Sequence, residues 1–412
     1  MVSIDFNVLQ FIGKGCYSMV YEVSPKSDQE NQSIYAFKRI FIQEPNAIEC
    51  AIRERNILVR IAEDTSPPPF LPTLYYSYIL KNSPVLVLHR GSGWDLFQLL
   101  TRQKLLSEHD ARFYASEIIC GLEHLHSMQI VHLDLKPENI LLDKYGHLII
   151  SDFDRSFDLS LNQTPKPTDF GGTLSFMAPE IAKQELLSTK ADIWSLAALI
   201  AEMVSGPIRS LSRNDEQSRK LARQNQYKIA NLNKLSKNLQ SLFNTCLASN
   251  PNARPDIAGV KGLRFFKFVD WEKVLSFTLQ PPFDPSTFGS SPSISDWGVD
   301  PFDKFLLDAA FDEHMPLIRG KLELERCRPS GGIRCVPVSP NYEKLKKAGI
   351  NIEHIQDYLG EFNFVHPSLR KPDSEVPEIV ENKEVDEVST SLDVSQMSVE
   401  LELVRERHFS RD

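Results

Sequence analysis

The first ninety residues of this chain alternate between apolar and polar positions in the way that β-strands do. The alternation runs over residues 6–42, around a glycine-rich turn, and returns over residues 69–90, where positions 86–88 are apolar enough for a buried strand. Between these stretches, apolar residues recur at helical spacing from 47 to 62. The pattern therefore predicts a small, sheet-rich lobe with one helix packed on its sheet.

After Gly91 the hydrophobic pattern changes to the period of helices. Long helical patterns cover residues 107–127, 190–205 and 234–248, and a loop is expected near 155–178. The second part of the chain therefore predicts a larger, mainly helical lobe. Together the two parts predict a protein of the α+β class.

Two segments in the last third of the chain show neither pattern. Residues 281–300 are rich in proline, serine and glycine, which predicts an extended segment without secondary structure that wraps the surface. Residues 372–412 hold 12 Asp and Glu against 4 Lys and Arg, with few aromatic residues and several serines. This composition predicts disorder, with a short helix over 399–407 when a partner is bound.

Charge and composition exclude several classes of function. Residues 372–412 carry −8 of the net charge of −9, so the rest of the chain is nearly neutral and offers no broad basic surface for nucleic acid. Hydrophobic residues make up 42% of the 412 residues, no run of about 18 apolar residues occurs, and the first residues lack the features of a signal peptide. We therefore expect a protein that stays inside the cell, cytoplasmic or nuclear, without inserting into a membrane, and we expect a monomer.

The six cysteines are scattered through the chain rather than spaced as a framework. Without a secretory signal, they are expected to be reduced thiols. Cys327 and Cys335 lie eight residues apart, but no second pair and no histidine cluster completes a zinc site. The cysteines therefore predict no metal centre.

The most informative chemistry lies in two short runs of the helical part. Residues 131–139 supply Asp134, Lys136 and Asn139, and Asp152 follows after an aliphatic stretch. Phosphoryl transfer needs a carboxylate near the attacking hydroxyl, further groups that hold Mg²⁺, and a cation on the phosphates. Any one of these acids alone is more often a helix cap or a surface residue, but the ordered set fits this chemistry.

These runs resemble the catalytic loop and the metal-binding motif of a protein kinase. The resemblance implies that Asp134 accepts or orients the proton of the substrate hydroxyl and that Lys136 neutralises charge on the transferred group. It implies that Asn139 and Asp152 bind Mg²⁺. It also implies a two-lobed kinase fold, with a small antiparallel sheet and one key helix in the first lobe, a mainly helical second lobe and an extended C-terminal tail.

The first lobe supplies the matching nucleotide motifs. Residues 12–20 resemble the glycine-rich loop of a kinase, although Ser18 stands at the third glycine position, and alone this run fits a hairpin with two turn glycines equally well. Lys38 stands where kinases carry the strand lysine that holds the α- and β-phosphates, and Glu54 stands where they carry its ion-pair partner. An exposed surface pair contributes only about 0 to 1 kcal/mol, so the importance of this pair lies in its geometry.

The resemblance also places the adenine site. Counting back from residues 93–97 makes Leu88 the gatekeeper, and the backbone from His89 to Gly91 would hydrogen-bond the adenine. Plain core packing is the competing role for the apolar residues around the ring. The implied ATP site consists of Ile12, Gly13, Gly15, Ser18, Val20, Ala36, Lys38, Leu88, His89, Gly91 and Leu141.

Further runs resemble the AGC branch of serine/threonine kinases, which the cAMP-dependent kinase typifies. Residues 136–139 together with Gly172 and Thr173 indicate the serine/threonine class. Residues 302–305 resemble the adenine-site tail motif of the branch, although a buried aromatic cluster that pins a tail to the core explains them as well. The other runs that carry the branch resemblance are residues 106–115, 146–154, 265–271 and 281–285.

The kinase resemblance covers about residues 6–270. Within it, residues 177–180 match the end of the activation segment, residues 192–195 open a buried helix, and Arg254 stands where kinases pair an arginine with Glu180. The expected parts of the chain are a first lobe at 1–91, a second lobe at 92–270, an AGC-like extension that wraps the core at 271–371, and an acidic disordered tail at 372–412.

Three acids match positions at which AGC kinases bind arginine ahead of the acceptor residue. They are Asp95, Glu138 and Glu202, and charge-assisted pairs with them would favour basic protein substrates, with Arg or Lys upstream. Each has a surface or capping role as its alternative. Residues 171–173 would form the turn before the substrate groove, which includes Thr173 in the implied substrate site, although an ordinary loop explains them too.

Two residues depart from the kinase pattern. Leu133 replaces the arginine of the His-Arg-Asp motif and Asp154 replaces the glycine of Asp-Phe-Gly, but neither change removes a reacting group. In kinases the arginine that is missing here usually binds a phosphate on the activation loop. The primary phosphorylation position of this chain is already occupied by an acidic residue, Asp169. We therefore hypothesise that loop phosphorylation does not gate activity, with Thr168 and Thr173 as the remaining phosphorylation sites.

The resemblance implies an enzyme that uses ATP and Mg²⁺ to phosphorylate Ser or Thr of protein substrates. The alternative is a pseudokinase or scaffold that keeps the fold and signals through its surface and acidic tail. The intact Lys38, Asp134, Asn139 and Asp152 favour the enzyme. Transfer to a small molecule is poorly supported, because residues 171–180 resemble the wall of a peptide groove.

Overall fold

The computed structural model of the protein describes residues 6–15, 17–27, 33–42, 44–64, 70–208, 215–288, 307–308, 310–311, 342–351 and 354–370. All of these residues belong to the unit 1–370. Several expectations concern residues outside the described ones, namely the adenine tail motif at 302–305, the pair Cys327 and Cys335, the acidic tail at 372–412 and its helix at 399–407. Among the described cysteines, Cys50, Cys120 and Cys246 are free thiols.

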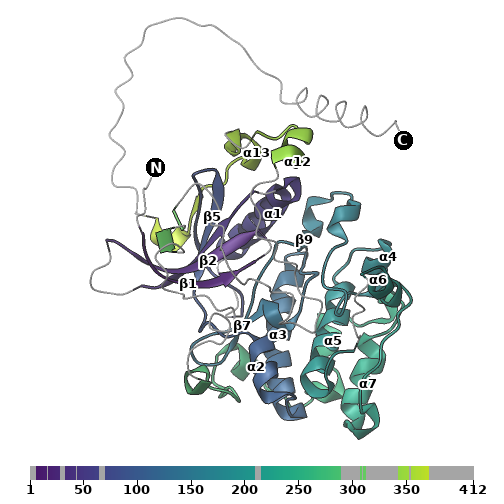
Figure 1. Ribbon diagram of the computed structural model, residues 1–412. Helices are drawn as coiled ribbons and strands as arrows, with labels where there is room; N and C mark the ends of the chain where they lie inside the picture. Colours follow the sequence, from purple (N-terminus) through teal and green to yellow (C-terminus); the bar gives the residue numbers. More distant parts are fainter. Residues whose placement is uncertain are drawn as a thin grey trace, which may run out of the picture. The chain divides into compact units, whose positions relative to one another are not determined.

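A six-stranded sheet forms the first part of the unit, in the order β1, β2, β3, β5, β4, β10, and all neighbouring strands are antiparallel (Figure 1). The alternation over residues 6–42 and 69–90 predicted such a sheet, and its first five strands confirm it. The strands are β1 (Phe6–Lys14), β2 (Ser18–Pro25), β3 (Tyr35–Ile40), β4 (Leu74–Leu80), β5 (Ser83–His89) and β10 (Phe364–Val365).

Helix α1 (Pro45–Ala62) packs on this sheet through its contacts with β4. It begins two residues before the expected start because Pro45 occupies the first turn, where the fixed φ of proline fits and its missing amide is not needed. Its buried face includes Ala47, Leu58 and also Glu54. The helix therefore carries one carboxylate into the interior.

The second part of the unit is built around α3 (Glu108–Ser127) and α5 (Lys190–Ser205), which pack against each other (Figure 1). Helix α5 is buried along most of its length, as is typical of a helix that is apolar on all sides. With α7 (Lys237–Cys246), these helices confirm the predicted helical lobe. The other α-helices among the described residues are α2 (Leu96–Gln103), α4 (Pro179–Lys183), α6 (Asp215–Arg223), α8 (Ile257–Lys261), α9 (Trp271–Leu275), α12 (Tyr342–Lys347) and α13 (Gln356–Leu359).

Two short antiparallel pairs lie within the helical part. Strand β6 (Ile130–Val131) pairs with β9 (Phe157–Asp158), and β7 (Ile140–Leu142) pairs with β8 (Leu148–Ile150). These pairs bracket both runs that carry the candidate chemistry, residues 131–139 and 151–154. The pairing therefore brings the two runs together in space.

A buried ion pair ties the end of the activation segment to the helical core. The two terminal nitrogens of Arg254 donate to the two carboxylate oxygens of Glu180 at 2.6 and 2.8 Å, and the side chains are 0% and 3% exposed. Arg254 also donates to the carbonyl oxygens of Ala248 and Lys190. Because a buried charge needs such complete pairing, this contact fixes the start of α4, as the kinase resemblance implied.

The expectation that residues 281–300 lack secondary structure is wrong at 285–288. A 3₁₀ helix spans Pro285–Phe288. The side chain of Asp284 accepts the amide of Ser286, and its carbonyl accepts the hydroxyl of Thr287. An Asp followed by Pro favours such a turn, so the proline that suggested an extended chain instead begins the helix.

Strand β10 was not predicted from the sequence. It extends the sheet at β4, with Phe364 opposite Ser77 and Val365 opposite Tyr76. The Ser77 hydroxyl donates to the carbonyl oxygen of Phe362 at 2.6 Å, and Phe362 and Phe364 are 2% and 8% exposed. The segment that follows α13 is thus held by both backbone pairing and aromatic burial.

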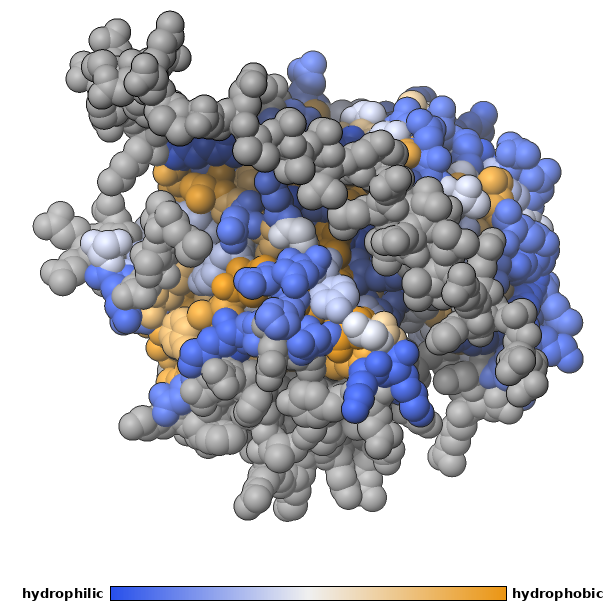
Figure 2. Space-filling view, turned by 90° about the horizontal axis from the view of Figure 1, so that it is seen from above, coloured by the Kyte–Doolittle hydropathy of each residue, from blue (hydrophilic) through white to orange (hydrophobic). Residues whose placement is uncertain are grey.

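One face of the molecule shows how polar and apolar residues are distributed on it. On the face shown in Figure 2, hydrophilic residues surround smaller hydrophobic areas. No helix among the described residues combines the length and the apolar character needed to cross a membrane.

Replacing Phe362 should show how much the docked segment stabilises the protein. We expect Phe362→Ala to lower the free energy of unfolding by about 3–5 kcal/mol, because it removes a buried aromatic ring. The matched control is Phe268→Ala, because Phe268 is 84% exposed and its loss should change that energy by at most about 0.5 kcal/mol. Urea unfolding measures both, and equal effects of the two substitutions would contradict the docking.

Candidate active site

The candidate residues line one cleft between the sheet and the helical part, with a volume of about 580 Å³. A cleft of this size matches the pockets that hold cofactors and nucleotides. Every predicted catalytic, nucleotide and metal residue lies on its lining: Ile12, Gly13, Gly15, Ser18, Val20, Ala36, Lys38, Glu54, Leu88, His89, Gly91, Asp134, Lys136, Asn139, Leu141 and Asp152. Of the predicted substrate residues, Asp95, Glu138 and Thr173 also line it, whereas Glu202 does not.

The glycine-rich turn is held tightly where β1 passes into β2. The amide of Gly15 donates to the carbonyl oxygen of Ser18 at 2.8 Å, and a Cβ on Gly15 would lie only 2.6 Å from the Ser18 hydroxyl oxygen. Ser18 is 4% exposed and begins β2. A side chain at position 15 would therefore require the Ser18 hydroxyl to move, and glycine avoids this conflict.

Lys38 joins the sheet, helix α1 and the run at 151–154 around the cleft. From β3 its ammonium group contacts both carboxylate oxygens of Glu54 on α1, at 2.7 and 2.8 Å, and the carboxylate of Asp152 at 3.1 Å. The Lys38 side chain is 15% exposed and that of Glu54 is 3% exposed. Burial disfavours the charged ammonium, but the carboxylates of Glu54 and Asp152 outweigh it and raise the pKa of Lys38.

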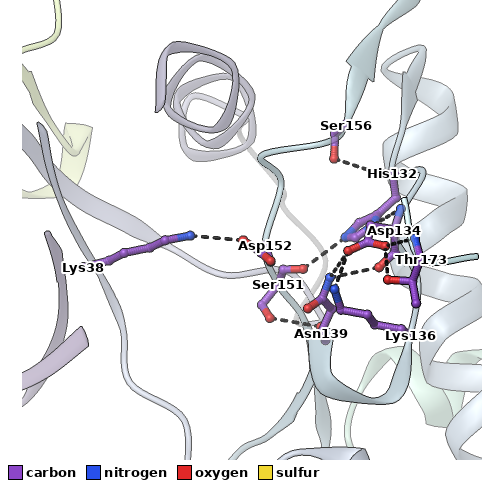
Figure 3. Close-up of polar contacts among 9 residues, drawn as sticks. All are labelled: Lys38, His132, Asp134, Lys136, Asn139, Ser151, Asp152, Ser156 and Thr173. Carbon is purple, nitrogen blue, oxygen red and sulfur yellow. Dashed lines mark hydrogen bonds and ion pairs between the residues drawn. The ribbon is translucent and has the colours of Figure 1, made fainter. Parts of the chain in front are cut away.

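The Asp134 carboxylate is held by four hydrogen bonds from three residues (Figure 3). Lys136 donates at 2.5 Å and the Asn139 amide at 3.2 Å, while the backbone amide and hydroxyl of Thr173 donate at 2.7 and 2.8 Å. Burial opposes the charge of Asp134, but Lys136 and these bonds lower its pKa below the usual value. Asp134 is therefore an oriented carboxylate at neutral pH.

Asn139 and Asp152 supply oxygen donors suited to Mg²⁺. Although burial opposes its charge, Lys38 and Lys136 lower the pKa of Asp152 to about 2, so it stays ionised. The described residues contain no cluster of three or more His, Cys, Asp or Glu that would hold a metal alone. Mg²⁺ does not require one, because it commonly binds one or two protein oxygens together with substrate phosphates. These residues fit the implied ion.

Backbone strain marks both runs of the site. Leu133 and Asp152 have φ angles of 66° and 67°, a left-handed conformation that non-glycine residues rarely adopt. The Asp192 carboxylate at the start of α5 accepts the amides of His132 and Leu133 at 2.8 and 2.9 Å. The buried helix therefore imposes this conformation on the loop that carries Asp134.

Helix α1, which carries Glu54, binds a carboxylate of the activation segment. Leu133 is 4% exposed and packs in the core, so no cation from the catalytic loop reaches the activation segment at this point. Instead Arg53 on α1 bonds the Asp169 carboxylate at 2.5 Å and donates to the carbonyl oxygen of Asp154 at 3.2 Å. The amide of Lys166 donates to the other oxygen of Asp169. Sequence reasoning missed Arg53, although it directly precedes Glu54.

The three candidate acids for substrate arginine differ in their surroundings. Asp95 accepts the amide of Gln98 at 2.7 Å and begins α2, so it has the capping role considered as its alternative, yet it lines the cleft. Glu202 on α5 is half-buried, and its burial together with the charge of Glu138 raises its pKa to about 7. Glu138 and Glu202 are thus close enough to interact electrostatically.

Several residues on the cleft were not predicted. They are Tyr17 at the glycine-rich turn, Cys50 on α1, Arg155, Phe170 and Arg219 on α6. Two of them carried a signal in the sequence, because Tyr17 lies within the run at 12–20 and Arg155 directly follows the run at 151–154. The other three come from elements whose approach to the cleft depends on the tertiary fold.

Comparison with known proteins agrees with this geometry. Residues 6–266 match the family model described as the protein kinase domain, and the chain belongs to the protein kinase family. The antiparallel sheet and helical part are the two lobes of its fold.

The relatives point to the expected branch. The chain is 33% identical over 291 residues to human ribosomal protein S6 kinase alpha-6, an alignment that covers 69% of this chain and 38% of that protein. It is 32% identical over 289 residues to a RAC family serine/threonine-protein kinase homolog of Dictyostelium discoideum, covering 70% of this chain and 63% of that protein. The chain thus spans less than two thirds of either relative. Both belong to the AGC branch, which confirms the resemblance seen in the sequence.

Proposed function

We propose that this protein is a serine/threonine protein kinase that transfers the γ-phosphoryl group of ATP to hydroxyls of protein substrates. The observation that carries the proposal is the position of Lys38, which bonds Glu54 and Asp152 at once on the cleft that also holds Asp134. Positioning and charge compensation supply most of the catalysis in phosphoryl transfer, and these groups are already in place.

Each group has a role that follows from its surroundings. The Asp134 carboxylate can accept a hydrogen bond from the acceptor hydroxyl, because it is ionised and fixed by Thr173 and Asn139. Lys136 brings a positive charge to the same place and offsets charge on the phosphoryl group in transfer. Lys38 would hold the inner phosphates, and Mg²⁺ bound by Asn139 and Asp152 would neutralise phosphate charge.

The remaining cleft residues fit the base of the nucleotide. Ile12, Val20, Ala36 and Leu141 line the cleft and would enclose the adenine ring, next to the Leu88 gatekeeper. A Cβ on Gly91 would lie 2.9 Å from the carbonyl oxygen of Leu142, so glycine is needed where the chain leaves the sheet toward the second lobe. His89 and Gly91 would offer their backbone to the adenine edge.

The pseudokinase alternative receives little support from the site. Ser18, Leu133 and Asp154 depart from the family pattern, but none of them replaces a group that touches the phosphates or the acceptor. Lys38 and Asp134, which supply a cation for the phosphates and a carboxylate for the acceptor hydroxyl, are both present and hydrogen-bonded.

We infer that the protein substrates carry arginine or lysine upstream of the acceptor. Glu138 on the cleft and Glu202 beside it provide paired negative charge, and Asp95 adds a further carboxylate. Arginine binds such carboxylates through charge-assisted hydrogen bonds, which discriminate strongly against neutral residues. A peptide library without preference for upstream arginine would remove this part of the proposal.

We also propose that the activation segment needs no phosphate. Asp169 already provides the negative charge that Arg53 binds, and Arg53 links this contact to the helix of Glu54 and to the backbone of Asp154. The pair is mostly buried, with side-chain exposures of 19% and 7%, so solvent screens it little. Asp169 and Arg53 would therefore hold α1, and with it Glu54, in position without a phosphate.

Loss of either key group should abolish phosphotransfer. We expect Lys38→Met and Asp134→Asn each to lower the rate of radiolabel transfer to an arginine-containing peptide by more than about 100-fold. Lys267→Met is the matched control, because Lys267 is exposed outside the cleft. A wild-type protein that binds ATP but transfers no phosphate would instead support the pseudokinase alternative.

The preference for arginine should depend on pH. Glu202 has a pKa of about 7, so roughly a tenth of it is ionised at pH 6 and nine tenths at pH 8. Because only the carboxylate pairs with arginine, we expect the ratio of kcat/KM for an arginine peptide to that for its neutral counterpart to rise several-fold from pH 6 to pH 8. The ratio should become flat in Glu202→Gln, and a pH-dependent ratio in that variant would refute the assignment.

Activity should survive dephosphorylation but depend on Asp169. We expect phosphatase-treated wild type and Thr168→Ala to keep their activity within about twofold, while Asp169→Ala loses about tenfold, since breaking a mostly buried ion pair leaves Arg53 without its carboxylate. Kinase assays after phosphatase treatment measure this. Inactivation of wild type by phosphatase would count against the proposal.

A further inference from the structure

Arg155 is a half-buried arginine on the catalytic cleft whose role the proposed function does not explain. Its side chain lies against Gly171 of the activation segment. A Cβ built on Gly171 would approach the Arg155 Cδ to 3.3 Å and its Nη1 to 3.4 Å, so the guanidinium occupies the space that a side chain at position 171 would need. Glycine at this position leaves room for the arginine.

The groups that act electrostatically on Arg155 come from both lobes. Burial works against its charge, but Asp154, then Cys50 and then Asp134 outweigh this and raise the pKa of Arg155, and the Tyr17 hydroxyl also acts on it. Even so, within the described part of the chain Arg155 makes no side-chain hydrogen bond and no ion pair within 4 Å, unlike Arg53 and Arg254. Arg155 is also part of the lining of the cleft.

An arginine in this situation is suited to bind an anion. Partial burial costs solvation of the guanidinium, and that cost is recovered when an oxyanion accepts its paired N–H groups. Arginine prefers planar or tetrahedral oxyanions, namely carboxylate and phosphate. A site of this kind next to Asp134 lies where a peptide must bring its acceptor hydroxyl.

We propose that Arg155 binds a carboxylate or phosphate on the protein substrate, on a residue beside the acceptor. This inference rests on the proposed kinase function. The substrate is favoured over the nucleotide because Arg155 contacts Gly171, two residues before Thr173, which holds Asp134 (Figure 3). Lys38 and Lys136 already serve the phosphates.

The site would then recognise two charges on one peptide. Glu138 and Glu202 select a cation upstream of the acceptor, and Arg155 selects an anion next to it. Recognition of opposite charges at two points discriminates between peptides better than recognition of one charge. A peptide bound in the wrong register would place like charges together at both points. The substrate class is therefore a basic segment with an acidic or phosphorylated residue at the acceptor.

The test compares peptides that share one upstream arginine and one acceptor serine. Each flanking position carries Asp, Glu, phosphoserine or Asn in turn. For wild type we expect one flanking position at which an anion improves kcat/KM about tenfold, mainly through KM. The preference should disappear in Arg155→Met and persist in part in Arg155→Lys. The matched control is Arg219→Met, which removes another cation on the cleft and should leave the preference intact.

A second readout separates this inference from the kinase function itself. Fluorescence anisotropy of the labelled peptides without ATP should show the same loss of anion-dependent affinity in Arg155→Met, with thermal unfolding confirming that the variant is folded. No anion preference in wild type would overturn the inference, and so would an equal fall in kcat for every peptide, which would assign Arg155 to the nucleotide. If wild type transfers no phosphate at all, the proposed function fails, while the anisotropy still decides on Arg155.

Discussion

The contact between Lys38 and its two carboxylates is the constraint on which the rest of the site depends. One ammonium group joins the sheet to α1 through Glu54 and to the second lobe through Asp152. Three elements that are far apart in the sequence must therefore reach their positions together. A shift of α1 would leave Glu54 buried without its partner, which is costly, so the helix position and the charge state of the cleft are coupled.

Buried polar contacts hold the second lobe in position relative to Lys38 and its two carboxylates. Asp192 at the start of α5 fixes the backbone before Asp134, and Arg254 fixes Glu180 at the end of the activation segment. Between these anchors, Asp169 is bound by Arg53 from the first lobe. The loop of Asp134 and the activation segment are thus held by contacts from α5, from Arg254 in the helical core and from α1.

Sequence reasoning predicted the parts of the site whose chemistry is local. Lys38 and Asp134 lie in runs where residue type and spacing carry the signal, and the period of hydrophobicity placed the lobes. It missed contacts that depend on distant pairs, since the partner of Arg53 is 116 residues away. It also missed the 3₁₀ helix at 285–288 and strand β10, because a turn built on proline and a two-residue strand leave almost no periodic pattern.

The pairing of β10 with β4 has a consequence for synthesis of the chain. Phe364 lies opposite Ser77, about 290 residues earlier. At about 5–20 residues per second, a ribosome needs roughly 15–60 s to deliver β10 after β4. During that time the edge of β4 has open backbone groups, which are prone to pair with other chains. The nascent protein therefore passes through an aggregation-sensitive interval that ends only when β10 has been synthesised and has paired with β4.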